Sequence, residues 1–323
     1  MHPPFSMVFA TTLFGIGQGL FLALMTLQTY SNMHVLQIQD GPALYGWGAV
    51  WALAFLGVGL FSSTFHLGHP ERAWRAVSQW RTSWLSREVI LLPVLMALVF
   101  VYGGLQFMGW DIMFTAPGAP IDVSLSFVVG WLAVIVNIGL FVATGMIYAA
   151  IRFIQEWRCA MTPINYILLG TASGFLAATA LATVMAPGQV GLLQDLTIIL
   201  MVVAIAGKFA HLWRNGRIKY KSNVQTAIGI RHTKIQQKSM GFMGGSFNTK
   251  EFFSHKSVGF RNAVRWGFIV LAFAIPLITI IMTTNTTALI AAVVVMYIGL
   301  VMERWHFFAS ANHPQNLYYQ TVG

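Results

Sequence analysis

Long apolar segments recur along the chain, separated by short polar or Pro/Gly-rich stretches. A helix that crosses the hydrocarbon core of a bilayer needs about 20 mostly apolar residues. Eight segments meet this requirement: 6–28, 44–66, 87–108, 124–150, 164–186, 192–213, 263–283 and 288–308. Backbone polar groups in hydrocarbon must be satisfied within the segment, which favours helices. The pattern predicts an all-α polytopic membrane protein, with residues 1–323 forming a single integral membrane domain, a bundle of eight transmembrane helices.

Composition supports a membrane protein over a soluble helical one. The chain is 57% hydrophobic and only 9% charged, whereas soluble domains carry about 25% charged residues. Its one cysteine, Cys159, excludes an internal disulfide, an iron–sulfur cluster and a cysteine-rich zinc site. The N-terminus lacks a basic region, so the first apolar run is expected to be a retained span rather than a cleaved signal.

The positive charges predict the topology. The chain has 19 Lys and Arg, and with eight spans all of them fall on the same side of the membrane. The connections near 31–43, 109–123, 187–191 and 284–287 contain neither residue type. Cytoplasmic loops are enriched in Lys and Arg. We therefore expect this side, and both termini with it, to face the cytoplasm, in the inner membrane of a bacterium.

The longest connection, 214–262, lies between the sixth and seventh spans and holds ten Lys and Arg against one acid. One interpretation is a topology determinant that touches anionic lipid. The other is a docking surface for a soluble partner, favoured by the Gly- and Phe-containing stretch 241–247. No recognised nucleic-acid motif accompanies the charge, so nucleic acid is not an expected partner. The predicted docking residues are Lys219, Lys221, Arg231, Lys234, Phe242 and Phe247.

Ionisable groups within or beside spans are costly and point to function. A quinone headgroup needs hydrogen-bond donors to two carbonyl oxygens and groups that exchange protons. Histidine titrates near neutral pH, and a carboxylate beside it can pass protons, so His66 and Glu88 suit such a site. The full predicted quinone-binding set is His66, Glu88, Arg72, Trp74 and His69. A secondary set is Lys208, His211, Glu303, Arg304 and His306.

Other interpretations stay open for these residues. His66 and His69 suit a helix C-terminus, the arginines suit topology charges, and Trp74 suits an interfacial belt. His66, His211 and His306 share a predicted depth that permits one b-type haem near the cytoplasmic face. A transporter is a further class, although transporters typically place polar groups near the midplane and the charges here gather at one rim. No catalytic residue or metal site is predicted in this chain.

Two motifs carry a family resemblance. The segment 66–73, His-Leu-Gly-His-Pro-Glu-Arg-Ala, is followed by Ser-Trp-Leu-Ser-Arg-Glu at 83–88. Together they resemble the membrane anchor subunit of dimethyl-sulfoxide-reductase-type molybdoenzymes. The resemblance implies an eight-helix anchor without metal, a non-catalytic subunit that binds ubiquinone or menaquinone. It also implies two partners, a molybdopterin catalytic subunit and an iron–sulfur subunit, and puts the quinone-site histidine at His66 and the motif glutamate at Glu88.

A narrower resemblance concerns the loop and the tail. Residues 239–249 and 313–319 resemble the corresponding parts of the anchors of cytoplasmic sulfite dehydrogenases. The resemblance implies that electrons from sulfite oxidation pass through the iron–sulfur partner to membrane quinone. An anchor of a sulfoxide or other oxyanion reductase, which oxidises quinol, is the alternative within the family.

Overall fold

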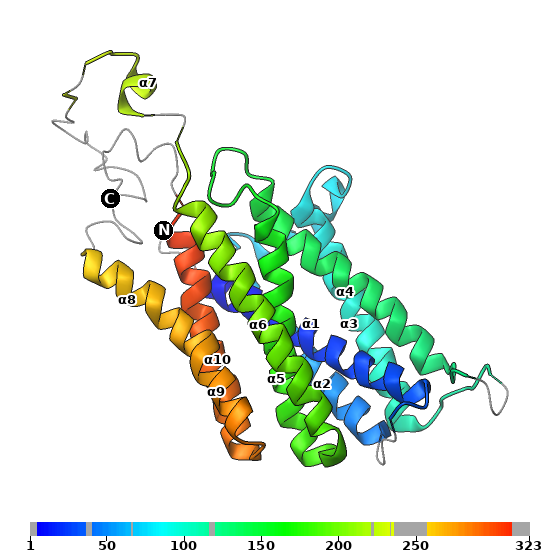
Figure 1. Cartoon of the computed structure of the whole chain (residues 1–323). Helices are drawn as coiled ribbons and strands as arrows, with labels where there is room; N and C mark the ends of the chain where they lie inside the picture. The colour runs from blue at the N-terminus through cyan, green and yellow to red at the C-terminus, as the bar shows by residue number, and fades with distance from the viewer. Residues whose placement is uncertain are drawn as a thin grey trace.

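A computed structural model of the chain describes residues 5–36, 41–65, 67–115, 120–220, 223–232, 234–235 and 257–311. Over these residues the protein is all-helical, and eight helical segments are long and apolar enough to cross a membrane. Figure 1 shows these segments running side by side as a bundle. The predicted fold class and the predicted number of spans are confirmed.

The membrane-spanning elements follow the chain in order. The first six spans are α1 (Phe5–Asn32), α2 (Gly41–Thr64), α3 (Trp84–Met108), α4 (Leu125–Ala149), α5 (Met161–Met185) and α6 (Val190–Asn215). The seventh span is formed together by α8 (Val258–Ile269), the π-helical turn η4 (Val270–Ala274) and α9 (Ile275–Met282). The eighth span is α10 (Thr286–Ala309). Shorter elements are the 3₁₀ helices η1 (Pro70–Gln79) and η2 (Pro187–Gln189), and α7 (Val224–Ile228).

Several helices begin earlier than hydropathy predicts, because polar side chains cap them outside the apolar run. Ser83 accepts a hydrogen bond from the backbone N–H of Ser86 at 3.3 Å, so α3 begins at Trp84 rather than at 87. Ser257 accepts from the backbone N–H of Phe260 at 3.2 Å, and α8 begins at Val258 rather than at 263. Such N-caps satisfy amide groups that have no partner within the helix.

Helix α1 is the most deeply packed span and contacts α2, α4, α5 and α10. Its crossing with α5 depends on glycine. A Cβ atom at Gly174 would lie 2.1 Å from the backbone carbon of Gly19, so the two helices touch backbone to backbone. Small residues at such crossings are the usual way in which helices approach closely in a membrane. This crossing brings the N-terminal half of α1 between α4, α5 and α10, where the polar groups described below lie.

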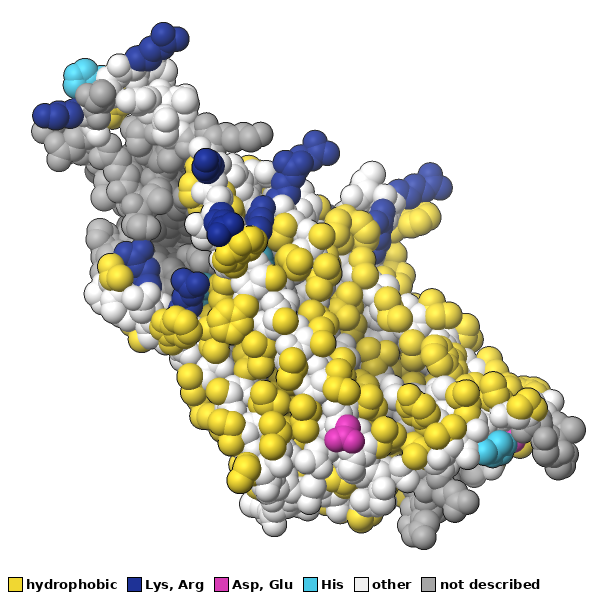
Figure 2. Space-filling model, viewed as in Figure 1, with side chains coloured by type: hydrophobic (Ala, Val, Ile, Leu, Met, Phe, Trp, Pro, Cys, Tyr) yellow, Lys and Arg dark blue, Asp and Glu magenta, His cyan; other side chains and the backbone are white. Residues whose placement is uncertain are grey.

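The two ends of the bundle differ in charge. Figure 2 shows Lys and Arg side chains gathered at the end that carries α7, and a largely hydrophobic surface over the rest of the visible face. We call this end the basic end. Figure 1 shows that α10 finishes there, beside the root of the long connection. The one-sided charge pattern is what the positive-inside rule describes.

Candidate functional site

Glu88 lies at the basic end, one turn into α3, and its side chain turns toward the neighbouring helix. Its Oε1 accepts a hydrogen bond of 2.6 Å from the hydroxyl of Thr144 on α4. Thr144 is buried and Glu88 is half-buried. A carboxyl group in a membrane-spanning helix with a single hydroxyl donor keeps three oxygen lone pairs for other partners. The Glu88 carboxyl group is therefore suited to exchanging protons with another group.

The connection between α2 and α3 carries most of the other predicted quinone-binding residues. Arg72 and Trp74 lie on η1 and His69 directly precedes it, and all three side chains are exposed, Trp74 at 70%. Glu71 pairs with His69 Nδ1 at 2.9 Å and with Arg72 Nε at 3.7 Å. Within the described residues, no hydrogen bond or ion pair joins these three side chains to Glu88. Position 66, the predicted quinone-site histidine, lies outside the described residues, two positions after α2 ends at Thr64.

A second polar centre is built from α6 and α10. Lys208 Nζ donates to Glu303 Oε1, and Arg304 Nε lies 3.7 Å from Glu303 Oε2. The Arg304 guanidinium stacks on the ring of Tyr166 from α5, 3.7 Å from the centroid. All these side chains are buried. We call Lys208, Glu303 and Arg304 the buried triad. Charges removed from water need partners of this kind, because an uncompensated one is strongly destabilising.

The two remaining residues of the predicted secondary set flank the triad. His211 Nε2 lies 3.2 Å from the carbonyl oxygen of Glu156, and the His306 ring packs 5.3 Å from the ring of Phe268. The structure thus brings all five residues of the secondary set to one region. In the described part of the chain, no group of three or more His, Cys, Asp or Glu could hold a metal ion.

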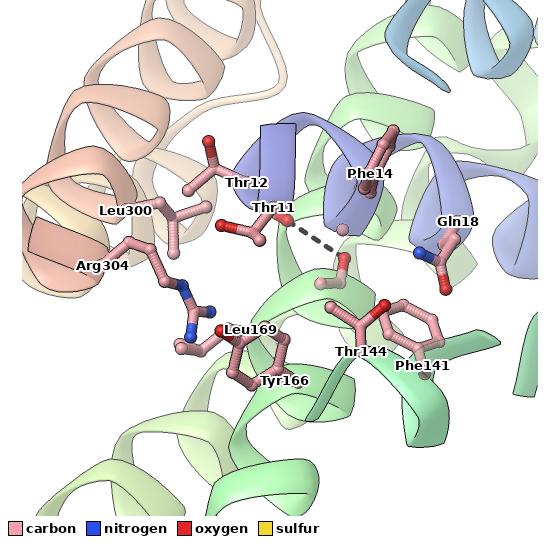
Figure 3. A pocket seen from close by; sticks show the side chains of 13 residues that line it. Thr11, Thr12, Phe14, Gln18, Phe141, Thr144, Tyr166, Leu169, Leu300 and Arg304 are labelled. Atoms are coloured by element: carbon pink, nitrogen blue, oxygen red, sulfur yellow. Dashed lines mark hydrogen bonds between the residues drawn. The ribbon is translucent and has the colours of Figure 1, made fainter. Parts of the chain in front are cut away.

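A small cavity lies between the two polar centres. It has a volume of about 20 Å³, and Thr144 lines it together with Tyr166 and Arg304. Gln18 from α1 is a further polar lining residue. Figure 3 shows the Arg304 guanidinium beside the Tyr166 ring, with Thr144 and Phe141 grouped on α4. Most of the cavity lining is apolar, and the cavity is far too small for a quinone ring.

Sequence reasoning missed Thr144, Tyr166 and Glu156. A single Thr or Tyr within an apolar span has no pattern that distinguishes it from a packing residue. Glu156 carries a weak signal, since it is an acid in a connection with Arg152 and Arg158, and it is buried. Its carboxylate accepts a hydrogen bond from Tyr220 Oη, which ties the root of the long connection to the preceding loop.

The predicted docking residues lie at the basic end where they are described. Lys219, Arg231 and Lys234 are exposed. Lys221, Phe242 and Phe247 lie outside the described residues. The root of this surface is held in place by Arg214, whose Nη1 donates to the carbonyl oxygen of Gln155 at 2.7 Å.

Comparison with known proteins places this helical bundle in a defined class. The model of the DMSO reductase anchor subunit (DmsC) family matches residues 1–319, and the chain belongs to that family. At the level of single proteins, it is 48% identical over 325 residues to one of the subunits of the sulfite dehydrogenase of Allochromatium vinosum, and the alignment covers 100% of both chains. The predicted resemblance to a membrane anchor subunit is confirmed by both matches.

Proposed function

We propose that this chain is the membrane anchor and quinone-reactive subunit of a three-subunit molybdoenzyme. It passes electrons between a docked iron–sulfur subunit and membrane quinone, and catalysis takes place in the molybdopterin subunit. The observation that carries the quinone assignment is the Glu88–Thr144 contact, a carboxyl group held by one donor within a membrane-spanning helix. Membership of an anchor-subunit family supports the assembly.

The proposed quinone-binding residues include the groups that a quinone needs. A quinone has two carbonyl oxygens, and its reduction consumes two protons. Glu88 supplies a proton-exchanging group, and His66 is proposed to donate to one carbonyl. Arg72, Trp74 and His69 stand at the same end of the bundle, where they would border the entrance from the membrane interface. The secondary set lies deeper in the helical bundle and consists of Lys208, His211, Glu303, Arg304 and His306.

Sulfite is the proposed substrate of the complete complex. The 48% identity to a sulfite dehydrogenase subunit and the loop and tail motifs both support it. Oxidation of sulfite to sulfate takes one oxygen atom from water and releases two protons and two electrons. The electrons would leave through the iron–sulfur subunit to quinone. The family description favours a second candidate, an anchor that oxidises quinol for a sulfoxide reductase; sulfite-dependent quinone reduction by membranes separates the two.

The partners are proposed to dock at the basic end, on the cytoplasmic side of the inner membrane. Lys and Arg gather there, and cytoplasmic loops are enriched in these residues. An iron–sulfur centre must approach the quinone closely for useful electron transfer, and Glu88 lies at the same end. The exposed cations of 214–262, a basic cytoplasmic loop between the sixth and seventh spans, offer a surface for an acidic face of a partner.

The quinone assignment is tested by Glu88→Gln in the assembled complex. The amide keeps the size of the side chain and a carbonyl that accepts from Thr144, but it cannot exchange a proton. We expect quinone-linked sulfite oxidation to fall about 100-fold or more, while electron transfer to an artificial dye continues at the parent rate. Asp195→Asn, an acid-to-amide change on an exposed face of α6, is the matched control. Unaltered quinone kinetics in Glu88→Gln would refute the assignment.

The docking surface is tested by reversing Lys219, Arg231 and Lys234 to Glu together. The reversed side chains and the acidic face of the partner would then carry like charges and repel, and we expect the partner subunits to leave washed membranes at lower salt than in the parent. Reversal of Arg75, Arg81 and Arg158 changes the net charge equally at the same end and serves as the control. Exposed pairs are screened by salt, so release is measured across a salt series. Equal release in both triple variants would favour lipid contact for this surface.

A further inference from the structure

Two of the proposed docking residues, Arg231 and Lys234, belong to a small folded unit that includes α7. Gln225 Nε2 donates to the carbonyl oxygen of His232 at 2.8 Å, and the backbone N–H of Lys234 donates to His232 Nδ1 at 3.0 Å. We call residues 223–232 and 234 the docking arm. Figure 1 shows α7 standing beyond the end of α6. These bonds run within the arm, so they fix its shape but not its direction from the bundle.

The turn that joins α4 to α5 is held firmly at the same end of the molecule. Arg214, in the last turn of α6, donates through Nη1 to the carbonyl oxygen of Gln155 at 2.7 Å. Trp157 Nε1 donates to the carbonyl oxygen of Phe307 on α10 at 3.0 Å. Residues 155–157 are therefore attached to two spans, and they form a fixed base beside the start of the long connection.

Glu156 is buried in this base, with 4% of its surface exposed. Its Oε1 accepts a hydrogen bond from Tyr220 Oη, and among the described residues its Oε2 has no hydrogen-bond partner. A buried carboxylate is costly unless donors compensate for its lost hydration. Tyr220 is the side chain that donates to it, although the tyrosine itself is exposed at 48%. The hydrogen bond therefore attaches the chain just before the docking arm to the fixed base.

We propose that the hydrogen bond from Tyr220 to Glu156 positions the docking arm for the partner subunit. We call this bond the clasp. The inference rests on the proposed docking at the basic end. The arm begins three residues after Tyr220, so holding Tyr220 against the base limits the directions in which the arm can leave the bundle. Glu156 is a positioning residue, because it is buried and acts through Tyr220.

The energetic consequence concerns the freedom of the arm before the partner binds. Without the Tyr220 hydroxyl, the Glu156 carboxylate loses its side-chain donor and must reach water, which requires the chain before the arm to move away from the base. The arm then takes many directions, and only a fraction of them matches the partner. The apparent Kd rises as the inverse of that fraction. An arm that is already positioned has less freedom to lose on binding.

Rebinding of the partner subunits tests the clasp. Membranes that hold the complete complex are stripped of their partners with salt and titrated with the recovered subunits. Tyr220→Phe removes only the hydroxyl, and Glu156→Leu removes the acceptor. We expect either change to raise the Kd about tenfold, because the competent fraction of the arm falls to about a tenth. Glu156→Gln keeps a carbonyl oxygen that accepts from Tyr220, so its Kd should stay within about threefold of the parent.

Two further variants separate the clasp from a general loss of stability. The double variant Tyr220→Phe with Glu156→Leu should bind no more weakly than either single variant, because both changes remove the same interaction. Tyr102→Phe is the matched control, since the Tyr102 hydroxyl donates to Gln28 at 2.9 Å inside the bundle. It loses a hydrogen bond of similar kind but leaves the clasp intact, so its Kd should equal that of the parent.

Trypsin cleavage of the stripped membranes reports on the clasp without any partner. Cleavage after Arg217 should be faster in Tyr220→Phe and Glu156→Leu than in the parent, whereas cleavage after Arg231 in the arm should be unchanged. A parental Kd in Tyr220→Phe, or a Kd in Glu156→Gln as high as in Glu156→Leu, would overturn the clasp. If reversal of Lys219, Arg231 and Lys234 still releases the partners in that case, the proposed docking stands and only the positioning contact is lost.

Discussion

The chain contains two pairs of adjacent Glu and Arg residues, and they show how strongly the surroundings change the energy of the same ion pair. Glu71 and Arg72 lie 3.7 Å apart with side chains 63% and 57% exposed. Glu303 and Arg304 lie the same 3.7 Å apart with side chains 1% and 6% exposed. The first pair sits on η1 at the surface of the basic end, and the second lies within the helical bundle.

The difference is one of solvation. Around Glu71 and Arg72, water stabilises each charge separately, and exposed pairs of this kind contribute about 0–1 kcal/mol. Glu303 has lost that hydration, so Lys208 and Arg304 must compensate for it. Two adjacent Glu–Arg pairs that both stand out in the sequence thus differ in energetic weight, because only the buried pair depends on its partners to replace hydration.

The largest effect is expected for Glu303→Gln. It leaves Lys208 and Arg304 buried without their carboxylate, and breaking a buried ion pair costs about 3–5 kcal/mol. We expect the free energy of unfolding, measured by SDS titration of the purified chain in detergent micelles, to fall by that amount. A loss below about 1 kcal/mol would show that the triad is compensated by other groups.

The double variant Lys208→Met with Glu303→Leu is the control for this prediction. It replaces the Lys208–Glu303 pair by apolar side chains of similar length and leaves the Arg304–Tyr166 stacking available. Replacing both partners of a buried pair is often close to neutral. Its destabilisation should therefore be smaller than that of Glu303→Gln alone, and the difference is the cost of leaving the Lys208 charge isolated, because Arg304 loses the carboxylate in both variants. Equal losses would point to packing rather than charge.

The sequence predicts the spans well but not the contacts between them. Hydropathy identifies all eight, because about 20 apolar residues are needed for each. It also marks Lys208 and Glu303 as ionisable groups within spans. Their pairing joins residues 95 positions apart in the sequence and follows from how α6 packs near α10. Thr144 could not be predicted at all, because its role arises only where α4 meets α3 and the cavity.

The 3₁₀ helix η1 was likewise absent from the prediction, which treated 67–86 as a connecting loop. Pro70 begins it, with a backbone φ angle that suits a helix start. Its apolar residues share one helical face, but none of its residues is buried, so that face does not join a core in the described part of the chain. The part of the motif at 70–73 thus lies on a surface element, whereas Ser86 and Glu88 of its second part lie on α3.

The smallest effect is expected for Glu71→Gln, the surface counterpart of Glu303→Gln. It removes the carboxylate that pairs with His69 and Arg72, but water hydrates all three side chains. We expect the free energy of unfolding of the isolated chain to change by less than about 1 kcal/mol, and the remaining effect to shrink further with added salt. Repeating the SDS titration on the assembled complex sharpens the comparison, because a docked partner that covers η1 would desolvate Glu71 and enlarge the effect. A loss in the isolated chain as large as that of Glu303→Gln would contradict the assignment of the two pairs to different environments.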